Sequence, residues 1–346
     1  MYPYRNPYED LPGEIESRAV RKAGYRELRF DTGSVRLNYV VGPDNGPPLV
    51  LLPAQTGTWQ SYERVLPTLA RHHRVYAVDV RGHGKSTWTP GDYSWASVGA
   101  DVAVFLREVL SEPSIVSGNS SGGLLALWCA SNVPEHVAGL VLEDAPVFSA
   151  EMPRFRDTDR YVYEGLRHAV VALEDFEHRD LADYLRGQTL PVSETRVKRM
   201  PVWFVRLLSR RIRADLRKRP DRPIRLRGFP WVVRTLFRSL SMFDPDFARA
   251  FVDGRFYAGL DHTEALTRTR CPLLVLHGDW HRFPAYGLVG AMDDDDAARI
   301  QQLVPQAEYR RIAANHVIHA YRPRQFVNAL EEFARSVSGR DGAQRE

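Results

Sequence analysis

The fold of this chain is decided by the run Ser114-Ile115-Val116-Ser117-Gly118-Asn119-Ser120-Ser121-Gly122-Gly123. Its first four residues are β-rich, and a helical run follows it. Residues 118–122 fit the pattern Gly-x-Ser-x-Gly, whose small residues let a strand and a helix approach each other across a sharp turn. The middle serine then lies at a helix N-terminus, where the helix dipole favours negative charge. We expect Ser120, and not Ser121, to be a nucleophile. The alternative is a glycine-rich turn that has no catalytic role.

Runs of strand length lie on both sides of this segment. The wholly apolar Pro48–Leu52 is typical of a buried parallel strand. The other expected strands are Val75–Val80, Ile115–Ser117, Val137–Leu142 and Pro272–His277, with a hairpin formed by Tyr25–Phe30 and Val35–Val41. Helical patterns separate them, for example at Ser97–Leu110 and Ser121–Ser131. Strands that alternate with helices predict a parallel sheet covered on both faces.

The alternation breaks in the middle of the chain. Between about Val147 and Arg255 the sequence has helical periodicity and many arginines, but no convincing strand. We therefore expect a sheet core that carries an inserted helical cap. The predicted organisation is an N-terminal arm (1–24), a core (25–146 and 256–338), a helical cap (147–255) and a C-terminal tail (339–346).

Composition excludes several classes of protein. The 346 residues are 44% hydrophobic and 26% charged, with a net charge of +4, which is too small an excess to indicate a nucleic-acid partner. No apolar run reaches the roughly 18 residues of a membrane span. The two cysteines, Cys129 and Cys271, have no metal-binding spacing, so we expect both to be reduced. We expect a cytoplasmic protein, and a secreted one whose leader was removed is the alternative.

Two further segments resemble conserved motifs of the α/β-hydrolase superfamily. The residues Asp79-Val80-Arg81-Gly82-His83-Gly84-Lys85-Ser86 are similar to the family's Asp-x-Arg-Gly-His-Gly-x-Ser loop, and Ala314–His319 is similar to its Gly-x-Gly-His-x-x-His segment. The resemblance implies an α/β-hydrolase fold, a mostly parallel sheet flanked by helices, with His316 as the general base. A loop histidine that caps a strand is the alternative for His316. His319 is then a structural or pocket-wall residue.

The resemblance also implies a position for the oxyanion hole. The family often has His-Gly after its third strand, whereas this chain has Pro53-Ala54-Gln55-Thr56-Gly57. By position, the backbone N–H groups of Gln55 and Ser121 should bind the developing oxyanion. Pro53 removes a backbone donor, but neither of these two.

The acid of the triad is the member with several candidates. In much of the family it lies three residues after a glycine that ends the seventh strand, and here that position, counted from Gly278, is His281. Asp144 follows the sixth strand, where relatives such as haloalkane dehalogenases carry their acid. We expect Asp144, with Asp279 as the alternative, because both lie at strand ends within reach of the histidine. The run Asp293–Asp296 is a weaker candidate, since acids suit a helix N-terminus.

The predicted cap is rich in arginine. Between Arg196 and Arg227 the only acids are Asp215 and Asp221. One interpretation is an electropositive lid that steers anionic substrates or contacts a membrane or nucleic acid. The other, which we prefer here, is a solvated helical face or a subunit interface. The aromatic residues between Phe229 and Tyr257 indicate a large apolar pocket or a cap core.

Together these features predict a serine hydrolase without metal or organic cofactor, since no His/Cys/Asp cluster has ligand spacing. The expected substrate is a small molecule, a bulky apolar carboxylic ester or lactone. This expectation rests on the fold-level resemblance. The alternatives are a carbon–carbon bond hydrolase, which the Gly-Asn-Ser-x-Gly-Gly elbow resembles, and a ligand-binding receptor. We expect no nucleic acid and no membrane span, and a homo-oligomer is open.

Overall fold

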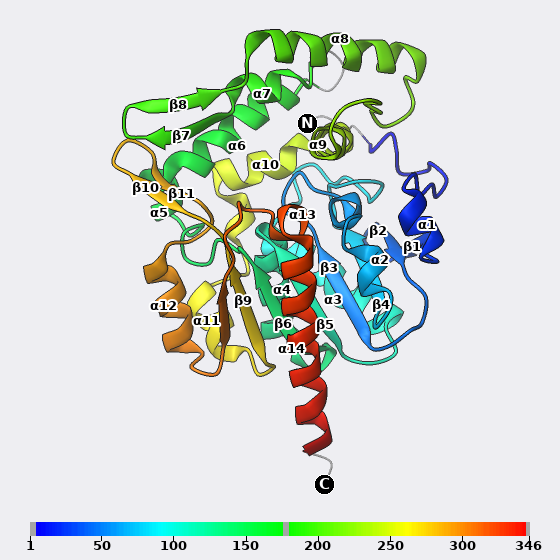
Figure 1. Ribbon diagram of the computed structural model, residues 1–346, viewed down its shortest axis with the longest axis vertical. Helices are drawn as coiled ribbons and strands as arrows, with labels where there is room; N and C mark the ends of the chain where they lie inside the picture. Colours follow the sequence, from blue (N-terminus) through cyan, green and yellow to red (C-terminus); the bar gives the residue numbers. More distant parts are fainter. Residues whose placement is uncertain (1–4, 176–179, 344–346) are drawn as a thin grey trace.

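An eight-stranded sheet forms the centre of the molecule in the computed structural model, which describes residues 5–175 and 180–343. The strand order is β1-β2-β4-β3-β5-β6-β9-β12 (Figure 1). β2 is antiparallel to β1 and β4, and all other neighbours are parallel. The predicted architecture, a mostly parallel sheet flanked by helices, is therefore confirmed. The strands are β1 (Arg26–Asp31), β2 (Arg36–Val41), β3 (Pro48–Leu52), β4 (Arg74–Asp79), β5 (Ser114–Asn119), β6 (Val137–Glu143), β9 (Leu273–His277) and β12 (Glu308–Arg311).

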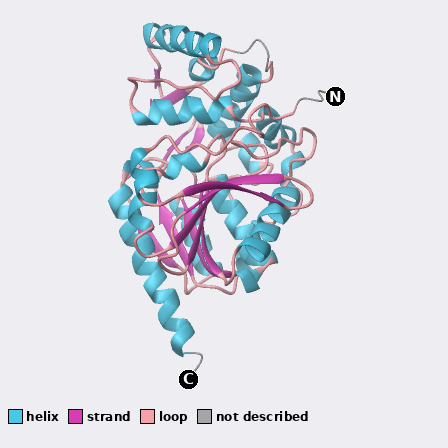
Figure 2. Cartoon of the chain, turned by 90° about the vertical axis from the view of Figure 1, so that its right-hand side faces the viewer, coloured by secondary structure: helices cyan, strands magenta, loops and turns pink. Residues whose placement is uncertain are grey.

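Helices cover both faces of this twisted sheet (Figure 2). Because side chains alternate along a strand, Val50 and Leu52 of β3 face one apolar cluster while Leu49 and Leu51 face the other. Burial on both sides explains why β3 is wholly apolar. The first cluster is closed by α3 (Trp95–Val109), α4 (Ser121–Asn132), α11 (His262–Arg268) and α12 (Asp294–Leu303). The second is closed by α1 (Arg18–Lys22), η1 (Trp59–Tyr62), α2 (Leu66–Leu69), α13 (Ile318–Tyr321) and α14 (Pro323–Ala343).

The segment between β6 and α11 leaves the sheet and lies above it in Figure 1. Its elements are α5 (Arg154–Asp157), α6 (Arg160–Leu173), α7 (Asp183–Gly187), β7 (Thr189–Ser193), β8 (Arg196–Arg199), α8 (Val202–Lys218), α9 (Trp231–Ser241), α10 (Pro245–Asp253) and η3 (Arg255–Tyr257). The expectation that this segment has no strand is wrong for β7 and β8, which pair antiparallel. Their signal is weak in the sequence because Pro191 interrupts β7 and proline is rare inside strands.

The N-terminal arm packs on the body of its own chain. Asn6 Nδ2 donates a hydrogen bond to the Ser86 carbonyl at 2.6 Å. Farther along the arm, Glu16 forms ion pairs with Arg238 at 2.5 Å and with Arg225 at 3.1 Å, both in the segment above the sheet. The arm therefore links the sheet core to that segment.

The parallel register brings the ends of four strands to one edge. Leu52 of β3 pairs with Gly118 of β5, Asn119 pairs with Glu143 of β6, and Glu143 pairs with Leu276 of β9. In open parallel sheets this carboxyl edge is where ligands bind. The segments that directly follow these strands contain Gln55, Ser120, Asp144 and Asp279, and His316 follows the neighbouring β12.

In the part of the chain that the structure describes, no helix combines the length and apolar character that crossing a bilayer requires.

Candidate active site

Ser120 occupies a strained turn between β5 and α4. Its φ of 56° and ψ of −124° lie outside the regions that side chains usually adopt. The turn is possible because a Cβ on Gly118 would lie 2.0 Å from the Gly122 carbonyl oxygen, and a Cβ on Gly122 would lie 2.3 Å from that of Leu52. The Ser120 N–H donates to the Glu143 carbonyl at 3.0 Å, which holds the turn against β6. Such backbone strain is found where function requires an exposed side chain.

His316 and Asp144 lie in direct contact. His316 Nδ1 is 2.8 Å from Asp144 Oδ2. The other carboxylate oxygen of Asp144, which is buried, accepts the Gly278 N–H at 2.8 Å. Burial by itself would lower the pKa of His316, but the hydrogen bond and charge of Asp144 outweigh it, so the pKa is raised above its ordinary value. Asp144 is thus placed to fix the orientation of the imidazole.

The other acid candidates lie elsewhere. The backbone N–H of Asp279 donates to the Ala314 carbonyl at 2.7 Å. Asp279 lines a cavity, and no hydrogen bond joins its side chain to His316 Nδ1. Asp293 is the N-cap of α12, where its side chain accepts the Asp296 N–H. Asp293 and Asp296 also form ion pairs, with Arg282 and Arg154 respectively. The structure therefore brings Asp144, and none of the alternatives, to His316.

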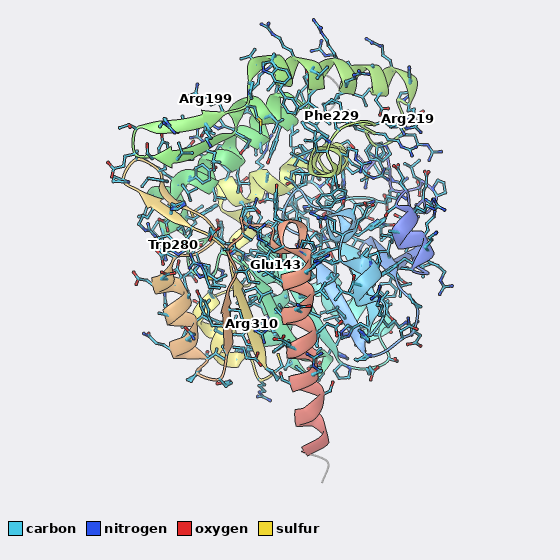
Figure 3. All side chains as sticks on the ribbon, in the orientation of Figure 1. Glu143, Arg199, Arg219, Phe229, Trp280 and Arg310 are labelled. Carbon is cyan, nitrogen blue, oxygen red and sulfur yellow. The ribbon has the colours of Figure 1, made fainter. Side chains whose placement is uncertain are left out.

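Glu143, the buried partner of His319, was missed by the sequence analysis, which expected only that His319 is a structural or pocket-wall residue. Glu143, the last residue of β6, accepts from the His319 N–H at 2.7 Å and lies 2.8 Å from His319 Nδ1. The His319 ring also stacks on Tyr62 with 4.0 Å between centroids. Asn119 Nδ2 donates to the His316 carbonyl at 2.8 Å. These contacts fix the His316 loop to the sheet, and Figure 3 shows Glu143 in the middle of the molecule. The sequence feature that could have revealed Glu143 is its position as an acidic residue directly before Asp144.

The predicted oxyanion donors both border the site, but one of them is already bound. The Gln55 N–H donates to Ser121 Oγ at 2.8 Å. The next residue, Thr56, has a φ of 63° and its N–H donates to His83 Nε2 at 3.2 Å. Burial lowers the pKa of His83 to about 4, so this ring stays neutral and can accept that bond. A substrate oxygen would have to displace or share the Ser121 hydroxyl at Gln55.

Two cavities meet at Ser120 and His316. One, of about 680 Å³, has mostly apolar walls, and the other, of about 650 Å³, has more polar ones. Apolar residues of the first include Leu124, Phe155, Leu166, Val192, Phe251 and Leu288. Polar residues of the second include Arg160, Glu164, His168, Tyr184 and Gln188. Ser120 is therefore accessible to a large molecule with an apolar part. Nowhere in 5–175 and 180–343 do three or more His, Cys, Asp or Glu side chains gather as metal ligands would.

Comparison with known proteins identifies the family. The model of the alpha/beta hydrolase fold matches residues 47–323. A fluoroacetate dehalogenase from Burkholderia sp is 30% identical over 151 residues, which is 42% of this chain and 48% of that protein. A pimeloyl-[acyl-carrier protein] methyl ester esterase from Yersinia pseudotuberculosis is 32% identical over 144 residues, 41% of this chain and 50% of the esterase.

The chain spans about half the length of these curated relatives. Among solved structures, the enol-lactonase from Burkholderia xenovorans LB400 superposes with a TM-score of 0.60 at 18% identity, over 89% of this chain and 99% of the lactonase. At that identity the likeness concerns the fold alone. Because the family model covers most of the chain, and the strand–turn–helix geometry around Ser120 agrees with it, the chain belongs to the α/β-hydrolase fold family.

Proposed function

We propose that this chain is a serine hydrolase in which Ser120, His316 and Asp144 form a catalytic triad. The observation that carries the proposal is the 2.8 Å contact between His316 Nδ1 and Asp144 Oδ2, on the wall of cavities that Ser120 also borders. A carboxylate on Nδ1 holds the proton there and leaves Nε2 free to accept one. That is the arrangement a serine nucleophile requires.

The proposed reaction proceeds through an acyl-enzyme. His316 takes the proton of Ser120 as the hydroxyl oxygen attacks the substrate carbonyl, and the imidazolium that forms is stabilised by Asp144. The oxyanion is bound by the Ser121 N–H and by the Gln55 N–H, which must first release or share Ser121 Oγ. His316 then protonates the leaving group, and water, deprotonated by the same histidine, releases the acyl group.

The cavities favour a carboxylic ester or lactone with a bulky apolar part. Apolar walls bind the apolar part by removing its surface from water. The relatives support hydrolysis: one is named a methyl ester esterase, and a structural neighbour is an enol-lactonase. The carbon–carbon hydrolase alternative rests only on the Gly-Asn-Ser-x-Gly-Gly elbow, and no feature of the described structure adds support to it or to the receptor alternative.

We also propose a cytoplasmic location. Its support is that Cys129 and Cys271 are both free thiols, and disulfides are rare in the cytosol.

The test is covalent labelling combined with turnover. A fluorophosphonate should add one adduct to the wild-type chain, mapped by peptide mass spectrometry to Ser120, and Ser120→Ala should lose the adduct and several orders of magnitude in kcat on an aryl ester. Ser121→Ala should still be labelled. An adduct on Ser121, or normal turnover by Ser120→Ala, would contradict the proposal.

A further inference from the structure

The outer face of α8 carries no function in the proposed reaction. At 3.6 residues per turn, the buried side chains Val205, Leu208 and Ile212 form its inner face. The opposite face is exposed and carries Trp203, Arg206, Leu207, Arg210, Arg211, Arg217 and Lys218. This face is basic along its length, with apolar side chains at its beginning.

Within residues 5–175 and 180–343, no neighbour neutralises the positive charge of this face. The one acid of α8, Asp215, pairs with Arg219 at 2.6 Å. Asp180 pairs with Arg213 at 2.9 Å. No described carboxylate lies within ion-pair distance of the basic residues on the exposed face. A partner of negative charge is therefore the complement of this surface.

The exposed apolar side chains form the other half of the surface. Trp203 is 68% exposed, Val202 65% and Met200 47%. The Trp203 ring packs edge-on against Phe204, with 5.8 Å between centroids. Grouped apolar side chains of this size on a surface indicate contact with another apolar phase. Tryptophan in particular is enriched where one end of a side chain is wet and the other is apolar.

The same surface continues onto the hairpin that borders the active site. β8 carries the exposed Arg196, Lys198 and Arg199, and Figure 3 shows Arg199 on the outer part of the molecule. Its partner β7 contributes Leu190, Pro191 and Val192 to the apolar cavity. α8 itself lies at the end of the molecule opposite the C-terminus (Figure 1).

We propose that this surface docks on an anionic lipid bilayer. We call it the basic face and define it by Arg196, Lys198, Arg199, Met200, Val202, Trp203, Arg206, Leu207, Arg210, Arg211, Arg217 and Lys218. A bilayer offers both complements at once, because anionic headgroups attract the cations and the interface accepts the apolar side chains. A nucleic-acid duplex, whose bases are stacked inside, offers this surface mainly phosphates and so complements only its charge. Docking places β7 and the apolar cavity near the membrane, a source of apolar substrates.

Vesicle sedimentation tests this without reference to catalysis. The full chain should sediment with vesicles of phosphatidylcholine mixed with phosphatidylglycerol, and not with phosphatidylcholine alone. The triple variant Arg206→Gln/Arg210→Gln/Arg217→Gln should partition on the order of 100-fold more weakly. A matched control, Arg107→Gln/Arg268→Gln/Arg324→Gln, removes the same charge from exposed positions on core helices and should bind like wild type. Trp203→Ser should bind more weakly and be released at lower salt.

Several results would overturn the inference. One is that the wild-type protein stays in the supernatant when mixed with anionic vesicles at low salt. Another is that the two triple variants lose vesicle binding to the same extent. A third is binding of duplex DNA, but not of vesicles, that the α8 triple variant abolishes. Ser120→Ala should sediment like wild type, so failure of the proposed catalytic function leaves the membrane test unaffected. Thermal unfolding and circular dichroism of each variant separate loss of binding from loss of folding.

Discussion

Two residues of the site, Ser120 and Asp144, have positive φ although neither is glycine. Each such conformation costs on the order of 1–3 kcal/mol and persists only where the surroundings impose it. Here the backbone imposes it: the Ser120 N–H donates to the Glu143 carbonyl at 3.0 Å, and the Asp144 N–H donates to the Leu276 carbonyl at 2.7 Å. Both bonds extend the sheet by one residue beyond the strand ends. The strain therefore orients two side chains toward the same edge of the sheet.

The acid can be assigned by two substitutions measured together. Asp144→Asn should lower kcat on an aryl ester by about 10³- to 10⁴-fold, because an amide cannot hold the required His316 tautomer or stabilise its charged form. Asp279→Asn should lose much less, since its backbone, not its side chain, is bonded to the His316 loop. Steady-state kinetics at saturating substrate measures both. A crippled Asp279→Asn beside a nearly unaffected Asp144→Asn would reverse the assignment.

The pH dependence should report on the same pair. In the proposed mechanism His316 acts as a base only when neutral. Because Asp144 raises the pKa of His316, kcat/KM should fall on the acid side with an apparent pKa above that of an ordinary histidine. Removing the carboxylate charge lowers that pKa, so the residual activity of Asp144→Asn should persist to lower pH than that of wild type. Rate profiles of both enzymes on one neutral ester provide the comparison. An acid limb that does not move would show that Asp144 does not act on this histidine.

At the scale of elements, the β7–β8 hairpin has two different sides. β7 borders the apolar cavity, while β8 carries exposed basic residues. The hairpin pairs only with itself and has no place in the central sheet. Its position beside Ser120 therefore depends on packing above the sheet rather than on strand pairing. This makes the hairpin a suitable place to change substrate selectivity without disturbing the core.

Narrowing the apolar cavity from this hairpin should change selectivity. Val192→Phe adds volume to the wall, so kcat/KM for a bulky ester should fall by about 10- to 100-fold, while that for an acetate ester should change little. The matched control is Val171→Phe on α6, where the side chain is 72% exposed. The ratio of the two kcat/KM values is the measurement. Equal losses on both esters in a folded variant would show that the cavity does not bind the bulky group.

At the scale of the whole molecule, the segment above the sheet is attached to the core at several places. Phe247 of α10 packs edge-on against His83 at 4.5 Å between centroids, and Thr58 Oγ1 lies 2.9 Å from Ser239 Oγ. The N-terminal arm adds the ion pairs of Glu16. The segment is therefore part of the folded body, although it contributes no strand to the central sheet.

Removing the attachment at Glu16 should loosen this segment. Glu16→Gln leaves Arg225 and Arg238 without their carboxylate, and because these groups are partly exposed we expect a loss of only about 1 kcal/mol in the free energy of unfolding. Trypsin should then cleave after arginines of residues 219–238 faster than in wild type. The control is Glu14→Gln, an exposed neighbour in the same arm. Urea denaturation and mass-mapped proteolysis measure the two effects. If Glu16→Gln and Glu14→Gln behave alike, the arm does not hold the segment.

The sequence by itself determined what depends on neighbours along the chain. Apolar runs of strand length predicted the sheet, because burial on both faces demands them. The glycines around Ser120 predicted the elbow, because only small residues allow strand and helix to meet there. The loop of His316 was predicted by resemblance to the family's motif. Each of these signals lies within a few consecutive residues.

The tertiary structure alone decided what depends on distance through space. Asp144 and Asp279 both follow strand ends, and only the register of β6 against β9 brings Asp144, rather than Asp279, to His316. The bond between Gln55 and Ser121 joins residues 66 positions apart, so no local pattern encodes it. The β7–β8 hairpin contains Pro191 within β7, so its strand pairing could not be read from the sequence pattern. Which polar groups meet is a property of the packed strands, which a sequence pattern does not contain.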